Sequence, residues 1–150
     1  MNNDTRLHSE LLPDDEIIAL LRELIAIPSF SGAEDETASL LARFLEQHRV
    51  PVSRIKNNVW AQNRHFDPTK PTIFLNSHHD TVKPNKGYTR DPFSPDVVDG
   101  QLFGLGSNDA GGALVSLLAA FLYFFEQAHL PFNLTYAATA EEETSGKNGV

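Results

Sequence analysis

Apolar positions along the chain recur with two spacings, and each spacing predicts a type of element. From Asp14 to Ile27 they fall three and four residues apart, which is typical of a helix with one buried stripe, and Pro28 ends the pattern. A second helix is predicted after Ser31-Gly32-Ala33-Glu34, where a carboxylate stands three residues after a Ser as in a capping box. Both helices are expected to be scaffold. The apolar face of the second helix is formed by Leu40, Leu41, Phe44 and Leu45.

Short β-prone runs predict the strands. They are Val50 to Ile55, Val59 to Gln62, Thr72 to Leu75, Gln101 to Gly104 and Phe132 to Ala138. The first two runs are joined by Lys56-Asn57-Asn58, whose Asn residues tolerate a left-handed backbone, so we expect a hairpin there. The run from Thr72 to Leu75 is compact and apolar, and it is predicted to be buried on both faces.

The second half of the chain contains a long irregular segment and a long apolar helix. Lys83 to Gly100 has three Pro, two Gly and no apolar periodicity, which predicts a loop. Asp109 to roughly His129 has apolar residues at helical spacing on most sides and is predicted to be a buried helix. The alternation of helices and buried strands predicts an α/β fold, namely a three-layer sandwich with a mixed, mostly parallel sheet.

Composition narrows the possible functions. With 12 Lys and Arg against 20 Asp and Glu, the net charge is −8, and the absence of a basic cluster argues against nucleic-acid binding. The chain has no Cys, so a metal site would have to use its six His and its carboxylates. Since no apolar run approaches about 18 residues and no basic n-region leads into an apolar stretch, we expect a cytoplasmic protein that does not bind a membrane.

Candidate chemistry begins where the strand Thr72 to Leu75 ends. In extended chain, His78 and Asp80 share a face and His79 points away. This geometry suits a metal ligand and the acid that orients it, because a ligating imidazole commonly donates its other N–H to a carboxylate. Taken alone, the three residues are more typical of a turn at a strand end.

A glycine-rich segment from Gly104 to Gly112 supplies the second candidate, Asp109. A dinucleotide fingerprint is excluded, because Asp109 stands where the pattern needs Gly and its charge would repel a pyrophosphate. An Asp that caps the following helix remains an alternative. Gly111 and Gly112 weaken that alternative, since helix-interior glycines cost about 1 kcal/mol each and suggest a close approach of the backbone.

The third candidate is Glu141-Glu142-Glu143, after the strand Phe132 to Ala138. Three adjacent carboxylates repel one another unless they are solvated or neutralised by a cation. A solvated acidic turn is the alternative here. Taken together, the three segments follow predicted strands, where α/β sheets place their ligands, and they offer only N and O donors. This combination is the ligand chemistry of a dinuclear zinc hydrolase, in which two ions activate a water.

The same segments resemble the motifs of the cocatalytic zinc aminoacylase and carboxypeptidase family. Leu75 to Val82 resembles its H-x-D segment, Phe103 to Gly112 its G-x-G-x-x-D-x-K-G-G segment, and Thr139 to Thr144 its D-E-E segment. The stretch Ser77 to Ala119 is most similar to the acetylornithine deacetylase-type members. Gly111 departs from the pattern, which usually has Lys there.

The resemblance implies a role for each candidate residue. His78 and Glu143 would each bind one of two Zn²⁺ ions, for which Co²⁺ is a possible substitute, and Asp109 would bridge the two. Asp80 would orient His78, and Glu142 would be the general base. The family also usually has a cis peptide after the bridging acid, here between Asp109 and Ala110.

The resemblance also implies a substrate and an organisation. The expected reaction is removal of an N-acyl group from an amino acid such as N-acetylornithine, a step of arginine biosynthesis, with a desuccinylase or a dipeptidase as the nearest alternatives. Residues 1–150 would be the N-terminal part of the catalytic domain of a homodimer, without the dimerisation domain and the C-terminal ligands. The isolated chain is then expected to be inactive and poorly soluble, with an unpaired strand edge and an uncovered apolar face along the helix Asp109 to His129. A non-catalytic module that binds metal weakly is the alternative from another class.

Overall fold

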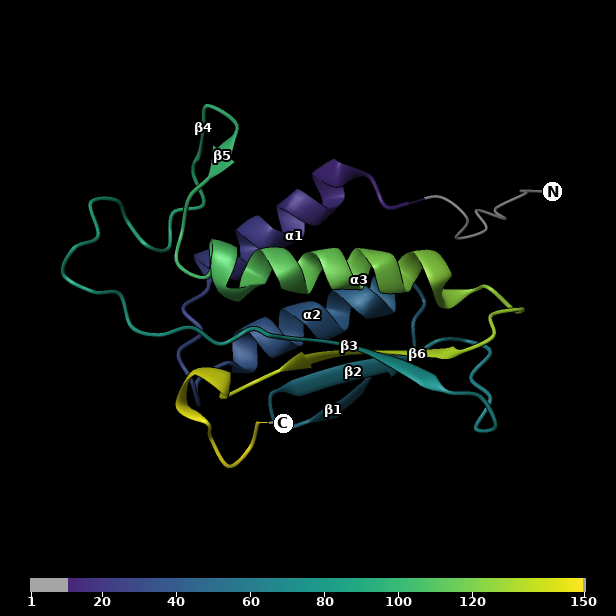
Figure 1. Ribbon diagram of the computed structural model, residues 1–150. Helices are drawn as coiled ribbons and strands as arrows, with labels where there is room; N and C mark the ends of the chain where they lie inside the picture. Colours follow the sequence, from purple (N-terminus) through teal and green to yellow (C-terminus); the bar gives the residue numbers. More distant parts are fainter. Residues whose placement is uncertain (1–10, 150) are drawn as a thin grey trace.

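A computed structural model describes residues 11–149, in which every helix and strand predicted above has a counterpart (Figure 1). The α-helices are α1 Asp14–Ala26, α2 Asp35–Gln47 and α3 Gly112–Phe125. The strands are β1 Ser53–Ile55, β2 Asn58–Gln62, β3 Thr72–His78, β4 Val97–Val98, β5 Gln101–Leu102 and β6 Asn133–Thr139. Two short helical turns complete the set, a π-type turn η1 at Ser107–Gly111 and a 3₁₀ turn η2 at Glu142–Thr144.

Four strands form a mixed sheet in the order β1-β2-β6-β3. The predicted α/β class and the mixed sheet are confirmed. Within the described residues, however, β1/β2 and β2/β6 are antiparallel and only β3/β6 is parallel, so the sheet is not mostly parallel. The short turn between β1 and β2 imposes an antiparallel pair, whereas α3 lies between β3 and β6 in the chain and allows a parallel crossover. The left-handed residue of that turn is Lys56, not one of the predicted Asn residues.

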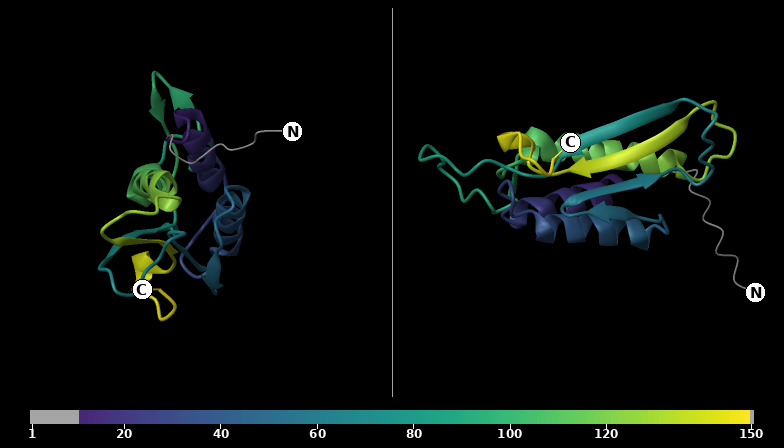
Figure 2. Two further views of the ribbon diagram at one scale, coloured as in Figure 1. Left: turned by 90° about the vertical axis from the view of Figure 1, so that its right-hand side faces the viewer. Right: turned by 90° about the horizontal axis from the view of Figure 1, so that it is seen from below.

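The three α-helices all lie on one face of the sheet, as the views in Figures 1 and 2 show. On the opposite face, Trp60, Phe74 and Ala137 help to line a hollow of about 550 Å³. Residues 11–149 therefore form two layers, and the predicted third layer is not among them. For the same reason the prediction that Thr72 to Leu75 is buried on both faces is wrong, since Phe74 is 52% exposed.

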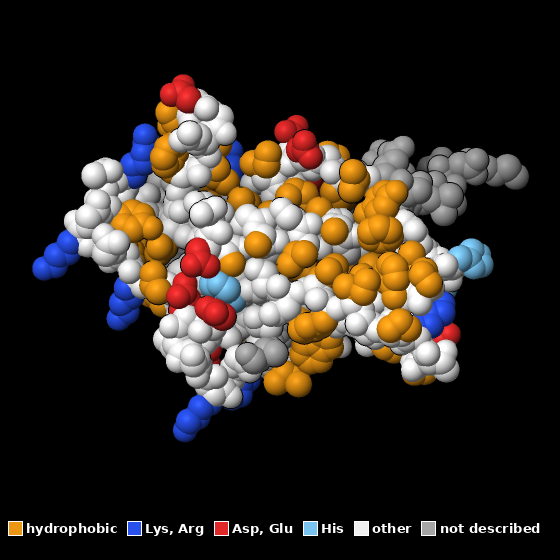
Figure 3. Space-filling view, in the orientation of Figure 1, with side chains coloured by type: hydrophobic (Ala, Val, Ile, Leu, Met, Phe, Trp, Pro, Cys, Tyr) orange, Lys and Arg blue, Asp and Glu red, His pale blue; other side chains and the backbone are white. Residues whose placement is uncertain are grey.

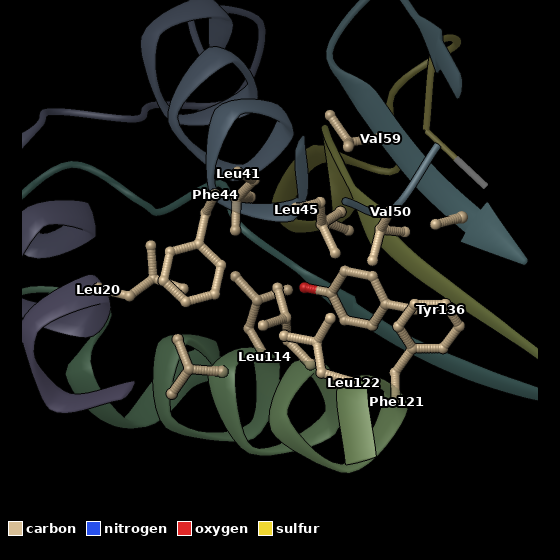
Figure 4. Packing of buried hydrophobic residues seen from close by; sticks show 14 of the residues in the cluster. Leu20, Leu41, Phe44, Leu45, Val50, Val59, Leu114, Phe121, Leu122 and Tyr136 are labelled. Atoms are coloured by element: carbon tan, nitrogen blue, oxygen red, sulfur yellow. The ribbon is translucent and has the colours of Figure 1, made fainter. Parts of the chain in front are cut away.

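The hydrophobic core lies between the helices and the sheet. The buried side chains of α3 are Leu114, Val115, Leu118, Phe121, Leu122 and Phe125. They pack against Tyr136 of β6 and against Leu41 and Leu45 of α2 (Figure 4). By length and composition, Ser107–Phe125 could cross a membrane. Its place in the core accounts for that apolar character without a membrane.

Candidate metal centre

The parallel pairing of β3 and β6 brings two of the candidate segments together. His78, the last residue of β3, pairs with Thr139, the last residue of β6. Because parallel strands end at the same edge of a sheet, the turn that follows β6 lies beside His78. That turn is η2, which carries Glu142 and Glu143.

Asp109 reaches the same edge by a different route from the predicted one. β5 pairs only with β4, in a hairpin separate from the main sheet, so the glycine-rich segment does not follow a strand of that sheet. Asp109 has non-helical angles (φ −119°, ψ 97°) inside η1, and the first residue of α3 is Gly112. Asp109 therefore neither caps α3 nor begins it. The expected cis peptide between Asp109 and Ala110 is present.

Gly111, which directly precedes α3, is required by close packing. A Cβ atom at Gly111 would lie 2.6 Å from the carbonyl oxygen of Gly106 and 2.7 Å from Cδ1 of Leu21. The Gly111 N–H donates to that same carbonyl, 2.8 Å away. The close backbone approach predicted here is confirmed at Gly111, and any longer side chain at this position would meet the same two atoms.

The three predicted metal ligands meet at this edge. One ligand atom from each of His78, Asp109 and Glu143 lies within 4.8 Å of the others. His78 Nε2 is 3.2 Å from Asp109 Oδ1 and 3.8 Å from Glu142 Oε2. The His78 side chain is 11% exposed, but those of Asp109 and Glu142 are 81% and 61% exposed. Figure 3 shows acidic side chains gathered around a His at this end of the molecule.

The hydrogen bonds of His78 fix which ring nitrogen faces the carboxylates. Nδ1 lies 3.0 Å from the carbonyl oxygen of Asp80 and 3.4 Å from its Oδ1. Since a carbonyl can only accept, Nδ1 carries a proton, and in the neutral ring Nε2 presents its lone pair. Burial lowers the pKa of His78, but the hydrogen bonds to Asp80 and Asp109 and the charges of Asp80 and Glu142 raise this pKa overall.

Asp80 joins His78 to the acidic turn. Its carboxylate is fully buried and accepts the backbone N–H groups of Glu142 and Glu143, each 3.1 Å away. The Ser31 hydroxyl also donates to it, at 2.7 Å. The predicted capping box is therefore wrong: α2 begins at Asp35, and Ser31 is used to hold Asp80.

The three consecutive Glu residues do not share one role. Glu141 has a left-handed backbone (φ 58°), and its carboxylate accepts from the backbone and side chain of Asn148. Glu142 and Glu143 face the site. Burial and the charge of Asp109 raise the pKa of Glu143, while His78 opposes that rise. Such crowding of negative charge is what a bound cation relieves.

Behind the site lies a buried polar layer that the sequence did not reveal. His79 points away from His78, as predicted, and is 6% exposed. Its Nε2 donates to the carbonyl of Asn57, its Nδ1 lies 2.9 Å from the Thr37 hydroxyl, and burial lowers the pKa of the ring. Glu34, in the motif interpreted as a capping box, is completely buried beside this layer.

A His and several carboxylates at the ends of parallel strands in an α/β sheet define the class of metal-dependent hydrolases. The comparisons agree with this assignment. The model of peptidase family M20/M25/M40 matches residues 74–150, and the chain belongs to this family.

Relatives with two different named activities are similar in sequence to this chain. Acetylornithine deacetylase of Edwardsiella ictaluri is 38% identical, over 85% of this chain and 36% of that protein. Succinyl-diaminopimelate desuccinylase of Wigglesworthia glossinidia brevipalpis is 31% identical, over 89% and 36%. The M20 family metallo-carboxypeptidase Sso-CP2 from Sulfolobus solfataricus has a similar structure, with a TM-score of 0.72 and 25% identity over 86% of this chain and 31% of that one. The chain thus spans about a third of the length of the relatives it matches.

Proposed function

We propose that the protein is a metal-dependent amidohydrolase that removes the acetyl group from an N-acetylated amino acid such as N-acetylornithine. The observation that carries this proposal is the convergence of His78, Asp109 and Glu143 within 4.8 Å, with the Glu142 carboxylate beside them. The deacetylase relative, at 38% identity, supports the choice of acyl group and amino acid.

The donor set fits the metals that the family resemblance implies. One imidazole nitrogen with a free lone pair and two carboxylates are suitable ligands for Zn²⁺ and for Co²⁺. We propose that His78 and Glu143 would each hold one of two Zn²⁺ ions and that Asp109 would be shared by both. Bound there, the metal would polarise the amide carbonyl and make a water acidic enough to lose a proton near neutral pH.

The protein's own residues would supply the proton transfers and the orientation. Glu142 is largely exposed at the mouth of the site, where its carboxylate can take a proton from water and pass it to the leaving amine. Asp80 holds His78 in one tautomer and one ring orientation. We further propose that the whole protein is a cytoplasmic homodimer whose substrate is a small molecule.

Replacing the proposed base tests this mechanism. In the full-length protein, Glu142→Gln should lower kcat for N-acetylornithine by a factor of about 10²–10⁴, because Gln cannot accept the proton. Metal content, measured by mass spectrometry of the purified protein, should stay near two zinc ions. Chelation should abolish activity, and Zn²⁺ or Co²⁺ should restore it.

Glu23→Gln, an exposed acid on α1, is the matched control and should keep normal activity. Near-normal turnover of the Glu142→Gln variant would show that the base assignment is wrong. A wild-type protein that binds no metal would overturn the proposal as a whole.

Two alternatives are distinguished by the same assays. Hydrolysis of N-succinyl-diaminopimelate in preference to N-acetylornithine would indicate a desuccinylase, the activity of the relative at 31% identity, and preference for a dipeptide would indicate a dipeptidase. The other alternative is a non-catalytic module that binds metal weakly. Comparing the 150-residue chain with the full-length protein tests it, and we expect only the full-length protein to bind metal firmly and turn over.

A further inference from the structure

Glu34 is a buried acid for which the proposed reaction has no use. It immediately precedes α2 and has an exposed fraction of 0%. A buried carboxylate is costly unless several donors surround it. The identity of those donors indicates what the residue does.

The donors come from three separate segments. Oε1 accepts the N–H of Gly32 at 2.6 Å and the N–H of Glu141 at 3.2 Å. Oε2 accepts the side-chain amide of Asn57 at 2.8 Å. Glu34 therefore links the start of α2, the β1–β2 turn and the first residue after Ala140, where the chain enters the acidic turn.

Together, Glu34 and Asp80 hold three successive backbone amides. Asp80 accepts the N–H groups of Glu142 and Glu143, and Glu34 accepts that of Glu141. Glu141 adopts a left-handed backbone, which L-residues rarely take up without external contacts to hold them. Its angles set the direction in which the following two carboxylates leave the sheet.

The β1–β2 turn supports the same region from the other side. Asn58 Oδ1 accepts the N–H of Ala140 at 3.0 Å, and the Asn57 carbonyl accepts from the buried His79 at 2.9 Å. The turn is thus fixed to the residue next to His78 as well as to Glu34. Movement of the Glu34 carboxylate would therefore affect both the acidic turn and the strand end that carries His78.

We propose that Glu34 is a positioning residue that fixes the backbone of Glu141 and thereby aims Glu142 and Glu143 at His78 and Asp109. This role rests on the proposed metal-dependent hydrolysis. Glu34 touches neither substrate nor metal and acts only through the turn. Groups that orient metal ligands from behind typically change affinity or activity by about 10–100-fold when they are replaced.

The test uses the full-length protein with Glu34→Gln and an exchanged pair, Glu34→Gln with Asn57→Asp. In the single variant an NH₂ group would face the NH₂ group of Asn57, and turning the Asn57 amide to pair with it would give up the contact of Asn57 Oδ1 with Arg54. In the double variant the Gln amide can donate to the Asp carboxylate, so the hydrogen bond returns with its polarity reversed. Glu36→Gln, exposed two residues further along, is the control.

We expect Glu34→Gln to lower kcat by about 10–100-fold with little change in KM, since a misplacement of about 1 Å at reacting groups can cost that much. The visible spectrum of the Co²⁺-loaded enzyme should change as the ligands move. In the metal-free protein, hydrogen exchange of the peptide containing Glu141 should be at least about tenfold faster. The double variant should recover most of the wild-type kcat, cobalt spectrum and exchange rate, and Glu36→Gln should match the wild type.

The inference is overturned if kcat per folded, metal-loaded enzyme, the cobalt spectrum and the Glu141 exchange rate are all unchanged in Glu34→Gln. A drop in the unfolding midpoint alone would show a purely structural role and would also overturn it. If Glu34→Gln does not fold, Glu34→Asp replaces it, since a carboxylate one methylene shorter should lose the contact with Glu141. Failure of the wild type to bind metal would refute the proposed function, whereas the exchange measurement on metal-free protein still tests the contact made by Glu34.

Discussion

The hydroxyl of Tyr136 is an uncompensated polar group in the core. The residue is fully buried, and among the described residues its oxygen has no hydrogen-bond partner (Figure 4). A buried donor without a partner costs roughly 1–3 kcal/mol, part of which is regained as packing by the oxygen itself. We therefore expect Tyr136→Phe to raise the free energy of unfolding by about 1 kcal/mol at neutral pH.

The same substitution should have a larger effect in alkaline solution. Burial raises the pKa of Tyr136 far above its usual value of 10.0. The unfolded chain would lose the proton near pH 10 while the folded chain keeps it, so wild-type stability should fall as the pH rises above 10. Urea denaturation at pH 7 and pH 10.5 checks both statements, with the half-buried Tyr123→Phe as control. A destabilised Tyr136→Phe variant at pH 7 would show that the hydroxyl does have a partner.

At the scale of single residues, the sequence predicted the candidate site residues better than the buried residues that hold them in place. His78, Asp80 and Asp109 could be identified because metal-binding side chains stand at recognisable spacings in the chain. Their roles as ligands and orienting acid remain predictions, although the structure brings them together. Ser31 and Glu34 were assigned to a helix cap, because a capping box and a pair of buried tertiary contacts have the same local sequence.

At the scale of elements, the turn that presents Asp109 depends on the absence of a side chain at Gly111. A Cβ atom there would overlap a backbone carbonyl of the same turn and the Leu21 side chain of α1. We expect Gly111→Ala to lower the free energy of unfolding by about 1–3 kcal/mol, as overpacking does, despite the better helix propensity of Ala. Displacing Asp109 should also weaken metal binding by the full-length protein.

Gly112→Ala is the matched control for that prediction. Its added Cβ atom would lie 3.1 Å from the carbonyl oxygen of Ser107, a contact that a small shift relieves. Urea denaturation and Co²⁺ titration of both variants check the expectation. Equal stability of the two variants would mean that the turn accommodates a Cβ atom at position 111 and that close packing does not require a glycine there.

The helices and strands were predictable because the spacing of their apolar residues reflects which side of each element is buried. The order and pairing of the strands were not predictable in this way. The strand order places β6 between β2 and β3, a pairing across the chain that no local pattern encodes. The element before Asp109 was expected in the main sheet but lies in the β4–β5 hairpin, since a two-residue strand carries almost no pattern. The site nevertheless forms, because the packing of η1 against α1 and β3 brings Asp109 to His78.

At the scale of the whole molecule, the 139 residues from 11 to 149 leave one face of the sheet without a covering layer. The uncovered apolar surface was expected along the helix from 109 to 129. The structure buries six of the fourteen residues of α3 and exposes none of its large apolar side chains, whereas Phe74 of the sheet is 52% exposed and, with Trp60, helps to line the hollow. β3 also has a neighbour on only one side within the described sheet. Exposed apolar patches and open strand edges are the usual starting points of association.

We therefore expect the isolated 150-residue chain to self-associate through this face. Phe74→Lys should shift the chain towards monomer in sedimentation velocity and reduce binding of an apolar fluorescent dye, because a charge on the patch must be desolvated for the faces to meet. Ile18→Lys is the control, since Ile18 is 44% exposed on α1, away from the sheet face. Equal effects of the two substitutions would mean that added charge, rather than the sheet face, controls association. In the full-length protein Phe74→Lys should instead destabilise the fold if further chain covers this face, so opposite effects in the two contexts would identify the face as an internal interface of the whole enzyme.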